Sequence, residues 1–172
     1  MPLALTPIPS IDQFESAQTV LIVPCHGCPR MCIAAERGKP FMNIGRRETD
    51  AFHAYIDEIR QAIAAQRKTA TVMKTPATSP MMCIWPHRVR DRLATISTSY
   101  DAIGVIGCES AVAKVAGAVS ISRDAIVPLS RTVGIANFLS KIDLPFSITL
   151  APSPQGTVPL PHTGANAQKG SR

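Results

Sequence analysis

Five cysteines carry most of the chemical potential of this sequence. Cys25, Cys28 and Cys32 form a C-x-x-C-x-x-x-C segment, and Cys83 and Cys108 follow singly. Thiolates are soft ligands that suit iron–sulfur clusters, zinc or copper(I). The segment supplies three sulfurs, and Cys83 or Cys108 can supply the fourth ligand that a cluster normally needs. We therefore expect a metal centre among all five cysteines, and our first interpretation is an iron–sulfur cluster.

Zinc is the main alternative metal, because histidine and cysteine together form structural zinc sites. The candidate extra ligands are His26, His53 and His87. His26 lies inside the cysteine segment and is the strongest of the three. His53 stands beside Phe52 in an expected helix, which is more typical of a surface histidine. This alternative predicts a zinc-stabilised module for protein interaction.

A thiol-dependent redox enzyme is a third interpretation. Cys28 could act as the attacking thiol of a thioredoxin-like pair. Two features argue against it, since the segment holds three cysteines and is not expected to open directly into a strong helix. A catalytic pair of Cys25 with His87 rests on residue type alone. Free cysteine is also among the most buried residue types, so simple packing stays open for each position.

The elements that position these cysteines alternate between strands and helices. Short apolar runs rich in β-branched residues predict strands at 19–23, 70–73, 102–106 and 125–129. Apolar spacing predicts helices at 51–66 and 86–98. The small and apolar stretch 110–119 is expected to form a helix packed closely against the sheet, and a last helix is expected near 134–140. This alternation indicates an α/β fold, a small parallel sheet of about four strands flanked by helices in a Rossmann-like three-layer arrangement.

The cysteines all follow expected strands. The triplet comes directly after the first strand, Cys83 lies in the connection after the second, and Cys108 ends the third. Connections that leave parallel strands emerge at one edge of the sheet, where ligands bind in such folds. We expect all five sulfurs in loops at that edge, none inside a helix face or a strand centre.

The length of 172 residues favours a single domain. We expect a lead-in at 1–18 with at most a short helix near 11–17, an α/β domain with the cysteine cluster at 19–150, and a disordered C-terminal tail at 151–172. The tail is rich in Pro, Gly, Ser and Thr.

Charge and hydropathy narrow the functional classes. The net charge is +6, but the basic residues are scattered and lack the interleaved aromatics of a single-strand binder, which argues against nucleic acid. No apolar run approaches the roughly 20 residues of a membrane helix, and the N-terminus lacks a basic signal-peptide region. We expect a cytoplasmic location, where thiols stay reduced. No G-x-G-x-x-G fingerprint supports a dinucleotide site.

Several segments together resemble a known family. They are VLIVPCHGCPRMC, then MMC before a helix, then YDAIGVIGCESAVAKVA, then IVPLSRTVGIANF. In the order and spacing of the cysteines and strands, residues 14–138 resemble the methylenetetrahydrofolate reductase C-terminal domain family. Members include the small iron–sulfur accessory subunit of reductases in anaerobic one-carbon metabolism.

The resemblance implies a role rather than a reaction. The protein would carry a cluster on Cys25, Cys28, Cys32, Cys83 and Cys108. It would support electron transfer in a larger flavin-containing or methyl-transferring enzyme subunit, as an accessory subunit rather than a catalyst by itself. The sequence departs from the family in two places. It has no C-x-x-C-G-x-C segment after Cys108, and the usual C-G-x-G is replaced by residues 108–111, CESA.

Overall fold

The computed structural model describes residues 3–7, 11–43, 51–75, 80–143 and 147–160. Its centre is a four-stranded sheet in the order β4-β2-β5-β6. The strands are β2 (Thr19–Pro24), β4 (Thr69–Val72), β5 (Ala102–Ile106) and β6 (Ile126–Pro128). Every neighbouring pair is parallel. The predicted parallel sheet is confirmed, with strand bounds within one or two residues of those expected.

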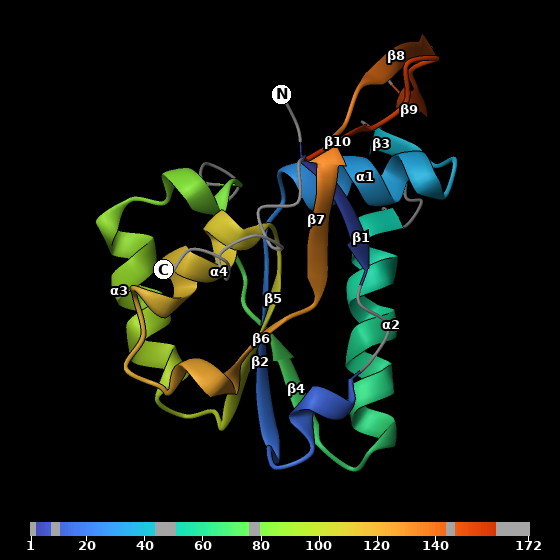
Figure 1. Ribbon diagram of the computed structural model, residues 1–172. Helices are drawn as coiled ribbons and strands as arrows, with labels where there is room; N and C mark the ends of the chain where they lie inside the picture. The colour runs from blue at the N-terminus through green and yellow to red at the C-terminus, as the bar shows by residue number, and fades with distance from the viewer. Residues whose placement is uncertain (1–2, 8–10, 44–50, 76–79, 144–146, 161–172) are drawn as a thin grey trace, which may run out of the picture.

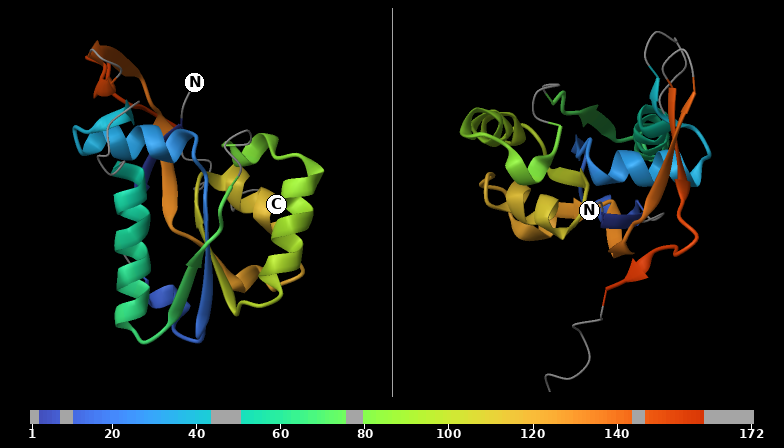
Figure 2. Two further views of the ribbon diagram at one scale, coloured as in Figure 1. Left: turned by 180° about the vertical axis from the view of Figure 1, so that it is seen from behind. Right: turned by 90° about the horizontal axis from the view of Figure 1, so that it is seen from above.

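Helices cover both faces of this sheet (Figures 1 and 2). Helices α1 (Cys28–Glu36) and α2 (Ala51–Ala65) lie on one face, and α3 (His87–Ser97) and α4 (Glu109–Ala116) lie on the other. The three-layer α/β architecture is therefore confirmed. None of the helices in the described ranges is long and apolar enough to cross a membrane.

Two hydrophobic clusters form the core, one on each face. Val20 and Ile22 of β2 pack in the cluster that includes Phe52 and Ile56 of α2. Leu21 and Val23 pack in the cluster that includes Leu93 of α3. This follows from the strand period of two, which sends successive side chains to opposite faces. Because both faces are buried, β2 reads as one continuous apolar run.

Two small antiparallel sheets stand beside the central one. The first contains β1 (Leu3–Pro7), β7 (Ser130–Ile135) and β10 (Val158–Pro159). The second contains β3 (Pro40–Asn43), β9 (Ser147–Pro152) and β8 (Phe138–Asp143). Figure 1 shows β8 and β9 projecting from the body of the molecule.

These sheets correct the helix expected at 134–140, which is wrong. Residues of this stretch belong to β7 and β8. The physical reason is pairing with distant segments, since β7 pairs with β1 and β10 while β8 pairs with β9. A Cβ at Gly134 would overlap the carbonyl oxygen of Val158, so the absence of a side chain lets β10 approach.

The two ends of the chain also carry more structure than expected. The lead-in contains strand β1, which was not expected. The 3₁₀ helix η1 (Asp12–Phe14) lies within the short helix expected near 11–17, and its Phe14 is 1% exposed and belongs to the core. Strands β9 and β10 continue past residue 150 into the stretch expected to be a disordered tail. The rest of that expectation, 161–172, falls outside the described residues.

Candidate functional site

The central sheet changes winding direction between β2 and β5. From β2 the chain crosses to β4 on one side, and it then returns to β5 on the other side of β2. The connections after β2 and β5 therefore diverge, and in open α/β sheets ligands generally bind beyond the carboxyl ends of two such strands. Cys25 directly follows β2 and Cys108 follows β5 after one residue. The expectation that these cysteines reach one edge of the sheet is confirmed for this pair.

Cys25 is held firmly at the end of β2. Its backbone N–H donates to the carbonyl of Ile106, 2.9 Å away, so the sheet ladder continues to this residue. Its side chain is 6% exposed. Its Sγ accepts a hydrogen bond from the backbone N–H of Met82 at 3.5 Å. Both backbone and sulfur of Cys25 are thus fixed by segments distant in sequence.

The segment after Cys25 is helical, which corrects the expected loop. Cys28 is the first residue of α1, and Cys32 lies inside that helix. Pro29 is compatible with this position because the first helical turn has no need of its N–H. Cys32 is buried and donates its thiol hydrogen to the carbonyl of Leu3 at 3.2 Å. The prediction that Cys32 lies in a loop is therefore wrong, and its thiol is hydrogen-bonded to a carbonyl of β1.

Cys108 is the N-cap residue of α4 and is partly buried. Its carbonyl oxygen accepts the N–H groups of Ala111 at 2.8 Å and Val112 at 3.1 Å. Cys28 and Cys108 therefore stand at the starts of two helices, α1 and α4. Peptide dipoles favour negative charge at such positions.

Cys83 lies on the 3₁₀ helix η2 (Met82–Ile84) and is exposed. This helix lies against α4. The residue before Cys83 is Met82, the same residue whose N–H bonds the sulfur of Cys25. The backbone of Pro80 also accepts the N–H of His26 at 2.9 Å. These two bonds join the segment that carries Cys83 to the end of β2.

Electrostatics connect three of the sulfurs. Burial raises the pKa of the Cys25 thiol, while N–H groups of Met82 and Gly27 oppose the rise, and negative charge on Cys28 and Cys108 adds to it. Burial likewise raises the pKa of Cys32. The N–H of Leu5 lowers this pKa, and negative charge on Cys28 raises it. Cys25, Cys28 and Cys108 are thus close enough for the ionisation of one to influence another.

Two glycines keep space beside Cys25. A Cβ at Gly27 would lie 3.7 Å from the Sγ of Cys25 and 3.0 Å from Cγ of Met81. A Cβ at Gly107 would lie 3.5 Å from Cβ of Cys25 and 2.5 Å from Cβ of Ala111. Side chains at either position would enter the space around this sulfur or displace α4.

Within the described residues, the candidate ligands His26, His53 and His87 do not join the cysteines in a group that could hold a metal ion. The ring of His26 contacts Phe52 of α2 in an edge-on arrangement, with centroids 5.2 Å apart, and lies 5.9 Å from the ring of His53. His53 is exposed on α2, as its sequence context suggested, and His87 is exposed at the start of α3. As the side chains lie, the described part of the chain contains no group of three or more His, Cys, Asp or Glu residues arranged to hold a metal ion.

Sequence reasoning missed the residues that frame the site. Met82 acts through its backbone N–H, and Ser130 exchanges two hydrogen bonds of 2.8 Å with Gly107, one to its N–H and one to its carbonyl. A backbone donor has no residue-type signal. The signal for Gly107 was available, because a glycine between a buried strand and a cysteine indicates a close approach.

Comparison with known proteins adds no relative. No family model, curated protein or solved structure matches this chain.

Proposed function

We propose that this protein is an accessory or electron-transfer protein whose thiols bind an iron–sulfur cluster at the carboxyl edge of the central sheet. The ligands in this proposal are Cys25, Cys28 and Cys108, with Cys83 as the fourth. The observation that supports it is the placement of Cys25 and Cys108 directly beyond the adjacent parallel strands β2 and β5, with Cys28 three residues after Cys25, beside one topological switch point.

The donor set and its surroundings fit such a group. All four candidate ligands are thiols, the ligand type that iron–sulfur clusters use. Two of them begin helices, where the peptide dipoles favour the thiolate form. Because their present side-chain positions do not surround a common ion, binding would require these thiols to move closer together.

The chain's own residues would have distinct tasks. The N–H groups of Met82 and Gly27 would hydrogen-bond the Cys25 thiolate, since both favour its charged form. The absence of side chains at Gly27 and Gly107 would leave room beside that sulfur. When bound, the cluster would supply one-electron transfer. Cys32 would not be a ligand, since its thiol is bonded to Leu3.

The partner and location remain part of this proposal. The sequence resemblance supports a larger flavin-containing or methyl-transferring enzyme of one-carbon metabolism as partner. The five cysteines are free thiols, which suits a reducing compartment such as the cytoplasm.

The test is anaerobic purification followed by reconstitution with ferrous iron and sulfide. We expect a brown protein with broad visible absorption and matching amounts of iron and acid-labile sulfide. The Cys25→Ser and Cys108→Ser variants should lose the colour, whereas the matched control Cys32→Ser should keep it. A folded wild-type protein that stays colourless and iron-free would overturn the proposal. Stoichiometric zinc, with unfolding by chelator, would instead support the zinc-stabilised module.

One observation favours a second function, thiol–disulfide exchange. Cys28 opens α1 directly, which removes an argument made against a thioredoxin-like pair. In this reaction the Cys28 thiolate would attack a disulfide of a substrate and release one thiol. A second cysteine would then form an internal disulfide, releasing the other substrate thiol, so that the protein loses the two electrons and two protons that the substrate gains.

This second function is tested by oxidation with a small disulfide and peptide mapping. It requires one specific internal disulfide that contains Cys28 and that a dithiol reverses. Mixed disulfides confined to the exposed Cys83 would rule it out.

A further inference from the structure

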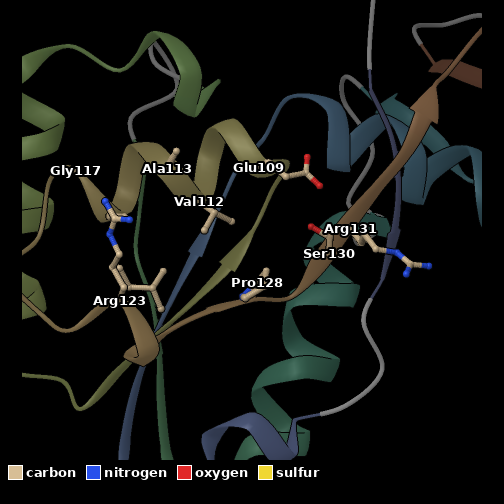
Figure 3. A pocket seen from close by; sticks show the side chains of 10 residues that line it. Glu109, Val112, Ala113, Gly117, Arg123, Pro128, Ser130 and Arg131 are labelled. Carbon is tan, nitrogen blue, oxygen red and sulfur yellow. The ribbon is translucent and has the colours of Figure 1, made fainter. Parts of the chain in front are cut away.

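A second site, which no cysteine lines, lies between α4 and strands β6 and β7. It is a half-open hollow of about 540 Å³, within the roughly 300–1,000 Å³ of small-molecule sites. Figure 3 shows its walls, with α4 above and β6 and β7 below. Its lining includes Glu109, Val112, Ala116, Arg123, Pro128 and Ser130.

Small and apolar side chains make the middle of this hollow. Val112 and Ala116 stand four residues apart on α4, so they share one face of that helix. Pro128 of β6 lies opposite Val112 in Figure 3. An apolar floor of this kind can receive a flat or branched hydrocarbon body, and burial of that body gives most of the binding free energy.

The polar groups at one end of the hollow are already bonded. The N–H of Thr132 donates to the carboxylate of Glu109 at 3.2 Å, and the hydroxyl of Thr132 donates to it as well. The hydroxyl of Ser130 is bonded to both N–H and carbonyl of Gly107. This end is therefore poor in donors for a ligand.

The opposite end has an available cation. In Figure 3 the guanidinium of Arg123 rises beside α4 near Gly117, across the hollow from Glu109. Within the described ranges, no carboxylate forms an ion pair with Arg123. Arg131 also borders the hollow, but its guanidinium points away from Val112 and Pro128. An anionic group would thus be recognised at one end only.

The free edge of the sheet is a poor site for an added peptide strand. Strand β6 is the outer strand, has three residues and ends at Pro128, which has no N–H to donate. Backbone pairing with another chain would find few partners there. A small molecule does not need to pair with the backbone of β6.

We propose that this hollow binds a small organic anion, with an apolar body over Val112, Ala116 and Pro128 and a carboxylate, sulfonate or phosphate at Arg123. This site is independent of the metal proposal, because no cysteine lines it.

The experiment uses the full chain and the fluorescent probe 8-anilinonaphthalene-1-sulfonate, with the uncharged N-phenyl-1-naphthylamine as comparison. Saturable binding of the sulfonate should raise its fluorescence. The Arg123→Gln variant should weaken that binding about tenfold, the scale of one lost hydrogen-bonded charge, and leave the uncharged probe unaffected. The matched control Arg131→Gln should bind both probes as wild type does.

A second variant tests the apolar floor. Ala116→Leu fills the hollow with a good helix former and should abolish binding of both probes. If circular dichroism shows that Ala116→Leu is unfolded, Ala113→Leu is used in its place for the same test. Amide shifts of Val112 and Gly117 on titration should locate the probe independently. Equal loss in the two arginine variants, or full binding in a folded Ala116→Leu or Ala113→Leu protein, would overturn the proposal.

Discussion

The backbone N–H of Met82 donates a hydrogen bond to the Sγ of Cys25, 3.5 Å away, across 57 positions of sequence. This bond joins the short helix that carries Cys83 to the end of the central strand β2. It gives the buried sulfur a donor that favours its charged form, while burial has the opposite and larger effect on the pKa. Reactivity of the cysteines should reflect that balance.

Alkylation should therefore proceed in a defined order. With iodoacetamide at pH 8 on the metal-free protein, we expect the exposed Cys83 to react first and the buried Cys25 and Cys32 last. The thiolate is the reacting form, and burial raises the pKa of both late thiols above the usual range of a thiol. The alkylation rates of Cys25 and Cys32 should still be rising at pH 9, and peptide mass spectrometry can measure them. Rapid labelling of Cys25 in the folded protein would contradict this description of the site.

The space beside Cys25 can be tested at Gly107. In Gly107→Ala the new Cβ would lie 2.5 Å from Cβ of Ala111, so α4 must shift. We expect a loss of about 1–3 kcal/mol in the free energy of unfolding, the usual cost of overpacking. The double variant Gly107→Ala/Ala111→Gly removes the overlapping atom and should recover part of this loss, although glycine in a helix costs about 1 kcal/mol itself.

Chemical denaturation with urea measures both variants. Gly117→Ala is the control, because its Cβ would come no closer than 3.4 Å to the carbonyl of Ala113. It should leave stability near that of wild type. If the losses in unfolding free energy of the two single changes simply add in the double variant, then a side chain at position 107 does not overlap Ala111.

The core of the fold follows from sequence because its signals are local. β2 and β5 are short apolar runs buried on both faces. The face of α2 that holds Phe52 and Ile56 repeats at helical spacing. Such patterns need no knowledge of distant partners, so the parallel sheet and the helices α2, α3 and α4 were predictable.

The missed elements depend on contacts that sequence does not show. Helix α1 begins at Cys28-Pro29, residues that otherwise indicate a turn, and it packs against β1 from the start of the chain. Strand β7 forms only because β1 and β10 pair with it. The placement of Cys25 and Cys108 at one edge of the sheet was predictable, because each follows an expected parallel strand. The bond from Cys32 to Leu3 was not predictable, because it depends on β1.

The amino end of the sheet depends on one carboxylate. Oδ2 of Asp101 accepts the N–H groups of Gln18 and Thr19 and the hydroxyl of Thr19, each at 2.9 Å. These bonds lower the pKa of Asp101, so the stability they give is present above the unfolded pKa of about 3.8 and is lost as pH falls through the folded value. Asp101→Asn should lower the melting temperature at pH 7, and the difference from wild type should shrink in strong acid.

Scanning calorimetry between pH 2 and pH 7 can follow this convergence. The exposed Asp124 lies on the 3₁₀ helix η3 (Arg123–Ala125), and Asp124→Asn serves as the control. It should leave the melting temperature close to that of wild type across the same range. A melting-temperature difference for Asp101→Asn that stays constant down to pH 2 would show that its charge does not stabilise the fold.

The contact between α1 and α2 includes one surface ion pair with two hydrogen bonds. The guanidinium of Arg37 donates to the carboxylate of Glu58 at 2.9 and 2.6 Å. The hydrogen bonds from Arg37 lower the pKa of Glu58, so this contribution is present above pH 4.5 and is lost as pH falls through the folded pKa. Both side chains are partly or largely exposed, Arg37 at 32% and Glu58 at 58%, so Glu58→Gln should cost only about 0.5–1 kcal/mol at pH 7.

Arg37 also lies over the ring of Tyr55, 5.6 Å from its centroid. Arg37→Gln should therefore cost more than Glu58→Gln in urea denaturation, and a part of that cost should persist at pH 3, where the ion pair is weakened. Equal losses that vanish together in acid would assign the whole effect of Arg37 to its carboxylate partner.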